Sequence, residues 1–282
     1  MIQAQLSAFP ARFRHDGRFP IHLGQPVSSR PPEERPFTPI HDARALQHGH
    51  DEAAFFADHG FVLLDHQSHV TDWSADPTTG YLAELETLIR TRLLPGKKLF
   101  IPPFATVVRR GPDTGNPYAT GVHQDCGIGP DDYQQLVGAF ASEAAAIGWR
   151  QGFDRDDVES YVLIDFWRPI NMREPLRHMP LALCEPSSVD LDDIVPTEIH
   201  GIAANGPVHQ MAVRRNPAQR WVYYPAMTGD EVLAFKLYDC RKGDNGELRS
   251  CFHTAFADPT APADAEPRSS CECRVGVFVL KD

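Results

Sequence analysis

Proline and glycine interrupt this 282-residue chain so often that few segments can form a long helix. It contains 25 prolines and 20 glycines, and after Lys98 they separate short runs rich in β-branched and aromatic residues. Such runs predict strands, which we expect at residues 99–101, 105–109, 161–167, 180–183, 210–213, 220–224, 231–235 and 274–280. Many short strands at this spacing favour a mainly β double-sheet jelly roll, with flanking helices packed on one side.

The first 48 residues differ from the rest of the chain. Their prolines stand among charged residues and predict an extended arm over residues 1–48 that lies on the body. Residues 49–282 are long enough for one large core, so we expect a single domain there. Apolar spacing and helix stop signals predict its supporting helices over residues 52–59, 80–94 and 131–147.

The charge balance excludes some partners. Lys and Arg number 27 against 38 Asp and Glu, a formal net charge of −11, which argues against a nucleic-acid groove but allows a local basic pocket for a small anion. No segment has the roughly twenty apolar residues needed to cross a membrane, and the first twenty residues lack the apolar core of an export signal. Six scattered cysteines without a CxxC pair predict reduced thiols. We therefore expect a cytoplasmic protein.

His123 and Asp125 are the first candidates for chemistry. They follow a predicted strand and lie two residues apart, a spacing that points both side chains to the same face of a strand. Two histidines and one carboxylate on one face hold non-haem Fe(II) and leave open positions for a cosubstrate and O₂. A His-x-Asp pair is common by chance, so its weight depends on a third ligand from elsewhere in the chain.

His253 is the candidate third ligand. It lies 128 residues beyond Asp125 (253 − 125) in a short apolar run that begins a strand, although a core histidine without a metal would fit the same run. The rival histidines stand among charges, glycine or proline without a following arginine, and we expect them in surface loops; they are His178, His200 and His209.

An arginine follows His253 after fifteen residues (268 − 253) and opens the final predicted strand. The two-residue period of a strand puts Arg268, Ser270 and Arg274 on one face. A guanidinium binds a carboxylate through two hydrogen bonds, and a neighbouring hydroxyl adds a donor. We therefore expect Arg268 and Ser270 to bind the distal carboxylate of 2-oxoglutarate. Arg274 could take that role or pair with Glu272, and an ordinary Arg–Glu surface ladder is the alternative.

Three further residues are candidates for a substrate pocket. Trp167 and Tyr224 lie on predicted strands, where aromatic side chains form either the core or the walls of a pocket. Arg168 ends an apolar strand, and a buried arginine is costly unless it meets an anion. That anion could be the substrate, the cosubstrate, Asp165 or Glu185.

Several motifs in this order resemble the CmcJ/AsaB-like oxygenases, which include a cephalosporin 7α-hydroxylation component and fungal hydroxylases and desaturases. The resemblance covers roughly residues 55–280, and its motifs are residues 122–125, 166–169, 180–184, 220–224, 227–232, 235–239, 253–256 and 268–274. It implies a double-stranded β-helix of the cupin-like type that uses Fe(II), 2-oxoglutarate and O₂. The expected activity is hydroxylation or desaturation of a small natural product, with release of succinate and CO₂.

The chain departs from this pattern at residues next to the expected site. Cys126 stands where a tyrosine or asparagine is expected, Asp165 stands where an asparagine is frequent, and cysteines replace aliphatic residues on both sides of Glu272. The expected metal and cosubstrate positions are unchanged. Cys126, which directly follows Asp125, is a fourth candidate for the pocket, and no relative's substrate is transferred to this chain.

Two other classes of function use the same residues differently. A cupin-like isomerase or hydrolase could bind a metal through His123, Asp125 and His253 without 2-oxoglutarate, and Arg268→Ala would then leave its activity largely intact. A metal-free binding or scaffold protein would bind no stoichiometric iron. The ligand set does not choose between hydroxylation and desaturation, because that depends on where the substrate carbon lies. The pattern also carries no information on oligomeric state.

Overall fold

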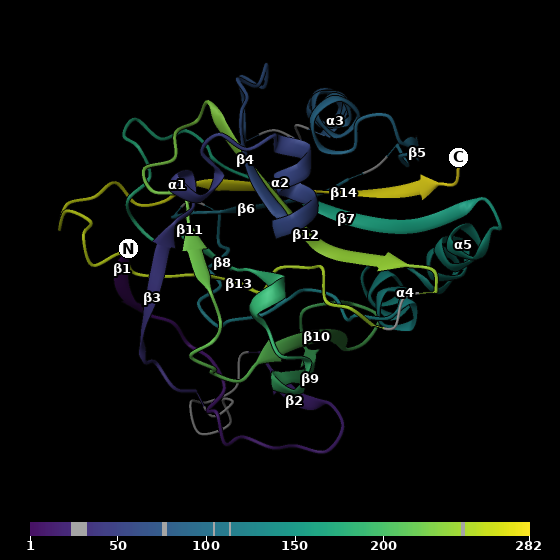
Figure 1. The fold of residues 1–282 in the computed structure, drawn as a ribbon, viewed down its shortest axis with the longest axis horizontal. Coiled ribbons are helices and arrows are strands. Elements are labelled where there is room, and N and C mark those ends of the chain that lie inside the picture. Colours follow the sequence, from purple (N-terminus) through teal and green to yellow (C-terminus); the bar gives the residue numbers. More distant parts are fainter. Residues whose placement is uncertain (24–32, 75–77, 104, 113, 244–245) are drawn as a thin grey trace.

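The computed structural model describes residues 1–23, 33–74, 78–103, 105–112, 114–243 and 246–282. Within these residues, three β-sheets form most of the molecule (Figure 1). The six-stranded sheet has the order β4-β12-β7-β14-β5, with β6 also paired to β14. Its strands are β4 (Phe61–Asp65), β5 (Lys98–Phe100), β6 (Thr106–Arg110), β7 (Val158–Pro169), β12 (Glu231–Arg241) and β14 (Ser270–Leu280).

Two smaller sheets complete the β structure. The five-stranded sheet has the order β1-β3-β11-β8-β13 and the three-stranded sheet the order β10-β9-β2. Their strands are β1 (Ile2–Gln5), β2 (Phe19–His22), β3 (Phe37–Asp42), β8 (Leu181–Cys184), β9 (Ile194–His200), β10 (Val208–Val213), β11 (Trp221–Tyr223) and β13 (His253–Ala255). The predicted mainly β architecture is confirmed.

Helices cover the outer side of the six-stranded sheet, where α2 packs on β4 and α5 on β7. The helices are α1 (Ala43–Gln47), α2 (Glu52–His59), α3 (Thr78–Leu88), α4 (Pro130–Phe140) and α5 (Glu143–Asp154). β7 is buried along almost its whole length, because helices cover one of its faces and the opposing strands cover the other. None of the helices in the described residues is long and apolar enough to span a bilayer.

Local signals account for most helix boundaries. The predicted helix over residues 52–59 is α2. Asp51 caps its N-terminus by accepting a hydrogen bond from the Ala54 amide at 2.9 Å, and Gly60 caps its C-terminus with a φ of 79°, which favours glycine. The single helix expected over residues 131–147 is wrong. Ser142 accepts a hydrogen bond from the Ala145 amide and caps a new helix, so the segment forms α4 and α5.

The first 48 residues contribute strands to both smaller sheets. β3 pairs with β11 in parallel, and β2 pairs with β9 in parallel. The division into an arm over residues 1–48 and a domain over residues 49–282 stays a prediction, with the added fact that the arm is hydrogen-bonded into the body. β9 was missed by the sequence analysis because Pro196 breaks its apolar pattern, although Val195, Thr197 and Ile199 are buried in alternation.

An ion pair fixes the end of this N-terminal segment to the main sheet. Glu231 accepts hydrogen bonds from Arg44 at 2.6 and 2.9 Å and from the Thr228 amide at 2.9 Å. Burial alone would raise the pKa of Glu231, but Arg44 and Thr228 outweigh it and hold this pKa below its ordinary value. The ion pair therefore contributes its full stability at pH values above the ordinary pKa of a glutamate. This contribution is lost as the pH falls through the lowered pKa that Glu231 has in the folded protein.

We expect Glu231→Gln to lower the free energy of unfolding at pH 7 by about 1–2 kcal/mol, since the pair is partly exposed and charged hydrogen bonds contribute about 1.5–3 kcal/mol when shielded from water. Urea denaturation of both proteins at pH 7 and at pH 3 measures this. The difference between them should shrink in acid, where the wild-type carboxylate is also protonated. An equal difference at both pH values would contradict the ionic role of Glu231.

Candidate metal centre and anion pocket

Backbone pairing brings His123 and His253 together. The His253 amide donates to the His123 carbonyl at 2.9 Å, and the His123 amide donates to the His253 carbonyl at 3.2 Å. The two residues are therefore directly opposite each other, with imidazole centroids 4.4 Å apart. Asp125 lies one step further along the same face, and the ligand atoms of the three residues all lie within 4.8 Å of one another.

Between His123 and Asp125, Gln124 anchors residues 123–125 in the core. The Gln124 side chain is buried and points away from the two ligands on either side of it. Its Nε2 donates to the Leu237 carbonyl at 2.6 Å and to Ser250 Oγ at 3.2 Å. Its backbone bonds to Met211 of β10 in both directions, at 2.8 and 3.0 Å. These contacts fix the direction in which His123 and Asp125 point.

The imidazoles are oriented to present the same nitrogen to the centre. His123 Nδ1 lies 2.8 Å from the Gly121 carbonyl and His253 Nδ1 lies 3.2 Å from the Cys251 carbonyl. A carbonyl only accepts hydrogen bonds, so each Nδ1 carries the proton and each Nε2 lone pair is available to bind a metal. The donor set thus consists of two imidazole nitrogens and a carboxylate oxygen.

Burial and neighbouring charges favour the metal-binding forms of His253 and Asp125. Burial, followed by the charge of His123, lowers the pKa of His253 to about 3, which keeps it neutral near pH 7. Burial would lower the pKa of His123, but its hydrogen bond to Asp125 raises it above the ordinary value. Burial would also raise the pKa of Asp125, but the charge of Arg274 and then His123 hold it well below its usual range. A neutral imidazole and a carboxylate are ready ligands.

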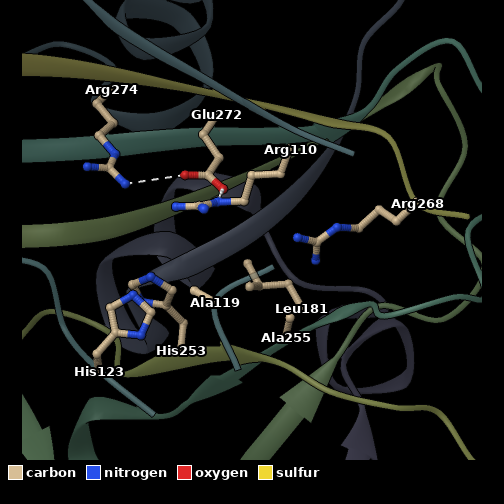
Figure 2. Close-up of a pocket in the computed structure, with 9 residues that line it drawn as sticks. All are labelled: Arg110, Ala119, His123, Leu181, His253, Ala255, Arg268, Glu272 and Arg274. Carbon is tan, nitrogen blue, oxygen red and sulfur yellow. Dashed lines mark hydrogen bonds and ion pairs between the residues drawn. The ribbon is translucent and has the colours of Figure 1, made fainter. Parts of the chain in front are cut away.

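A small cavity opens beside the two histidines (Figure 2). Ala119, Leu181 and Ala255 form its apolar wall, and the guanidinium of Arg268 points into it from the side away from the histidines. β14 contributes the polar wall, while β8 and β13 contribute the facing wall. The six-stranded and five-stranded sheets therefore enclose the cavity between them. The remaining lining residues are Arg110, His123, His253, Glu272 and Arg274.

Arg268 is buried without an anion. It is 1% exposed, and within the described part of the chain no carboxylate lies within ion-pair distance of it. Nη1 donates to the Met179 carbonyl at 2.7 Å, whereas Nε has no partner among the described residues. The rings of Tyr118 and Trp167 lie 4.3 and 5.5 Å from the guanidinium carbon. Burial lowers the pKa of Arg268 to about 10, so the side chain remains charged at neutral pH.

Ser270 is the first residue of β14, two positions after Arg268. Its hydroxyl is fully buried, and no group among the described residues bonds to it. Leaving a buried polar group unpaired costs about 1–3 kcal/mol. A bound anion that accepted hydrogen bonds from the Arg268 guanidinium and the Ser270 hydroxyl would remove this cost. The structure thus brings Arg268 to the same cavity as His123 and His253, and Ser270 lies two residues further along the chain, buried and outside the cavity lining.

Trp167 lies beside this anion pocket, but Arg168 does not. Side chains alternate along β7, so Arg168 points to the opposite side of the sheet. There it donates to the His66 carbonyl at 2.8 Å and to the Gly229 carbonyl, and it lies 5.4 Å from the Trp73 ring. Arg168 thus bonds to backbone carbonyls where an anion was expected, and its assignment to a substrate pocket stays a prediction.

Tyr224 and Cys126 are also placed away from the cavity. The Tyr224 hydroxyl donates to Gln47 Oε1 at 2.5 Å on the far side of the main core. Cys126 is fully buried in that core, and burial raises the pKa of its thiol well above the ordinary value. Neither lines the cavity beside the histidines, and their assignment to a substrate pocket stays a prediction. None of the six cysteines forms a disulfide among the residues that the structure describes.

The rival histidines have other partners. His200 and His209 lie in β9 and β10 and not in loops, which corrects that expectation; they contact Glu198 at 2.7 Å and Asp132 at 3.3 Å. His178 Nδ1 accepts a hydrogen bond from the Arg268 amide at 3.3 Å.

The sequence analysis missed Arg110 and Gln124. Arg110 ends β6 directly opposite Ser270, and its Nε donates to Glu272 at 2.9 Å. The strand around Arg110 was predicted, but its pairing partner was not. The buried position of Gln124 could have been predicted, because a residue between two ligands on a strand must point to the opposite face, into the core.

Comparisons with known proteins agree with this geometry. A family model described as oxidoreductase/YMDC permease-like domain matches residues 24–278. The chain is 31% identical over 116 residues to aspirochlorine biosynthesis protein N of Aspergillus oryzae, an alignment that covers 41% of this chain and 47% of the relative. It is 34% identical over 125 residues to hydroxylase/desaturase efuI of Hormonema carpetanum, covering 41% and 40% of the two chains.

A third relative has a counterpart among solved structures. The chain is 30% identical over 112 residues to Fe(II)/2-oxoglutarate-dependent dioxygenase nvfI of Aspergillus novofumigatus, covering 40% of this chain and 38% of the relative. All three alignments span less than half of the relative's length. The structure titled iron and alpha-ketoglutarate-dependent endoperoxidase NvfI superposes with a TM-score of 0.70 and 21% identity, over 99% of this chain and 98% of that one. The double-stranded β-helix expected from the resemblance is confirmed.

Proposed function

The chain belongs to the oxidoreductase/YMDC permease-like domain family, and on that premise we propose that it is an Fe(II)- and 2-oxoglutarate-dependent oxygenase that oxidises a small molecule. The observation that carries this proposal is the buried Arg268, which faces no carboxylate among the described residues and lines one cavity with His123 and His253, whose ligand atoms lie within 4.8 Å of that of Asp125. The names of the relatives, which include a hydroxylase/desaturase and a 2-oxoglutarate-dependent dioxygenase, support it.

The residues present fit both groups. His123, Asp125 and His253 form the two-histidine, one-carboxylate set that suits non-haem Fe(II). Arg268 and Ser270 offer the donors that a second, distal carboxylate needs. A metal enzyme that does not use 2-oxoglutarate would have no use for a buried cation in this position. The cupin-like alternative therefore leaves Arg268 and Ser270 unexplained.

When bound, iron with 2-oxoglutarate and O₂ would supply oxidative decarboxylation to succinate and CO₂, coupled to removal of hydrogen from a substrate C–H bond. The chain's own residues position the reactants. Arg268 would hold the distal carboxylate, with Ser270 as an additional donor. The rings of Tyr118 and Trp167 shield this contact from water, which strengthens it. The small side chains of Ala119 and Ala255 leave the space in which the cosubstrate would lie.

The reaction outcome and the location are parts of the same proposal. Hydroxylation and desaturation both begin with removal of one hydrogen, and the position of the substrate decides between them. Cysteines that form no disulfide within the described part of the chain suit a reducing compartment, which supports the cytoplasm.

The test is anaerobic reconstitution with Fe(II) followed by titration with 2-oxoglutarate. We expect a weak visible charge-transfer band, which forms only when the keto oxygen and the adjacent carboxylate both bind the iron. Iron binding without the band would favour a metal enzyme of another kind. Absence of stoichiometric iron binding would favour a binding protein.

A further inference from the structure

Arg274 lies between three carboxylates, one of which belongs to a candidate metal ligand. It projects from β14 on the same face as Arg268, Ser270 and Glu272, and Figure 2 shows its guanidinium above the two imidazoles. Nη2 lies 2.8 Å from Asp125 Oδ2 and 3.2 Å from Glu272 Oε2, and Nε lies 4.0 Å from Asp165 Oδ2. The surrounding negative charges thus fix the position of this guanidinium.

The two oxygens of Asp125 have different surroundings. Oδ1 lies 3.3 Å from His123 Nε2, on the side where the ligand atoms converge, and accepts a long hydrogen bond of 3.4 Å from Gln210 Nε2. Oδ2 faces Arg274 and has no aligned hydrogen bond among the described residues. The contact between Asp125 Oδ2 and Arg274 is therefore an ion pair, in which the positive charge of the guanidinium attracts Oδ2 more strongly than Oδ1.

We propose that Arg274 is a positioning residue that restricts Asp125 to binding the metal through one oxygen. This inference rests on the proposed function and assigns Arg274 a role different from the cosubstrate binding expected from the sequence. A carboxylate can bind a metal through one oxygen or two. If Asp125 used both, it would occupy a position that the cosubstrate or O₂ needs in a six-coordinate site. With Oδ2 held by Arg274, three positions stay open.

The charges around the two arginines support this division of roles. Arg274 is already opposed by Asp125, Glu272 and Asp165, so a carboxylate of 2-oxoglutarate would have to displace one of them. Arg268 has no such partner among the described residues. Arg268, which faces no carboxylate among the described residues, is therefore the better site for the distal carboxylate of 2-oxoglutarate. Arg274, which is already paired, is better suited to orienting Asp125.

The experiment compares two 2-oxo acids. 2-Oxoglutarate has a distal carboxylate and pyruvate does not, while both chelate through the same keto oxygen and carboxylate. Anaerobic titration of the Fe(II) protein, followed by the charge-transfer band, gives an affinity for each acid. We expect Arg274→Gln to weaken both by the same factor of about 10 to 100, the usual cost of losing a residue that orients a metal ligand. Arg274→Lys, which keeps the charge, should recover part of this loss.

Arg150→Gln is the matched control. It removes another arginine that contacts more than one carboxylate, Asp131 and Asp154, but Arg150 lies in α5 and does not line the cavity. We expect its ratio of pyruvate to 2-oxoglutarate affinity to stay at the wild-type value and both affinities to change less than in Arg274→Gln. If Arg274→Gln weakened 2-oxoglutarate alone, Arg274 would bind the distal carboxylate and the proposal would be wrong. Unchanged affinities for both acids would overturn it as well.

A second readout needs no cosubstrate. The visible spectrum of the Co(II)-loaded protein depends on the number and geometry of its ligands, so Arg274→Gln should alter it and Arg150→Gln should not. If the wild-type protein gave no band with either acid, the proposed function would fail, and the Co(II) spectra would then decide the role of Arg274 alone. Identical Co(II) spectra of the wild type and Arg274→Gln would refute that role.

Discussion

Replacing His253 by alanine is expected to abolish stoichiometric Fe(II) binding and, with it, the charge-transfer band and turnover. The residue supplies one of the three donors that lie within 4.8 Å of one another. Loss of a residue that only orients a ligand costs about 10- to 100-fold in metal affinity, so loss of the ligand itself should cost more than about 100-fold. Calorimetric titration with Fe(II) under anaerobic conditions measures the affinity directly.

The control for this variant is His200→Ala, a histidine in β9 that pairs with Glu198 instead of facing the cavity. It should bind iron as the wild type does. Circular dichroism and thermal unfolding of metal-free samples would establish that His253→Ala is folded, because the imidazole is buried against Phe235 and its loss leaves a small cavity. A folded His253→Ala protein that kept wild-type iron affinity would rule out the assigned metal centre.

Replacing Arg268 by methionine is expected to weaken 2-oxoglutarate binding by roughly 100- to 1,000-fold and to leave pyruvate binding nearly unchanged. Removing one member of a buried charge pair costs about 3–5 kcal/mol, and each 1.4 kcal/mol is a factor of ten in affinity. Methionine keeps the apolar volume between Tyr118 and Trp167, so the pocket should retain its shape. Anaerobic titration with each acid provides the two affinities.

A suitable comparison is Arg173→Met, which removes an arginine whose side chain is 90% exposed and only distantly paired with Glu266. It should leave both affinities at the wild-type values. The variant Arg268→Lys should fall between the wild type and Arg268→Met, since it keeps the charge but not the two-pronged geometry. Equal loss of both acids in Arg268→Met would mean that the arginine supports the fold of the site instead of binding a carboxylate.

Local periodicity predicted much of the site. The two-residue repeat of a strand placed His123 with Asp125, and the structure brings the ligand atoms of this pair together with that of His253. The pairing of Arg268 with Ser270 stays a prediction. These inferences need only the backbone geometry of a single strand. The first one holds because His123 and Asp125 lie in one extended segment, so no knowledge of the neighbouring strands is required.

The remaining features depend on which strands become neighbours. Periodicity separates Trp167 from Arg168, but only the position of β14 decides which of them faces the cavity. The carbonyls of His66 and Gly229 that satisfy Arg168 are brought to it by tertiary structure. The role of Arg274 likewise depends on Asp125, a residue 149 positions earlier in the chain (274 − 125). No short sequence pattern could have revealed these contacts.

The backbone bridge between His123 and His253 affects when the chain can bind a metal during its synthesis. The two residues are 130 positions apart (253 − 123), and each donates its amide to the other's carbonyl. A growing polypeptide that has reached only β12 already carries His123 and Asp125, yet has neither the third donor nor the strand that orients the first. We therefore expect incomplete chains to be poor iron binders. A metal would enter this site only after the strand that carries His253 had been made and had paired with the segment around His123.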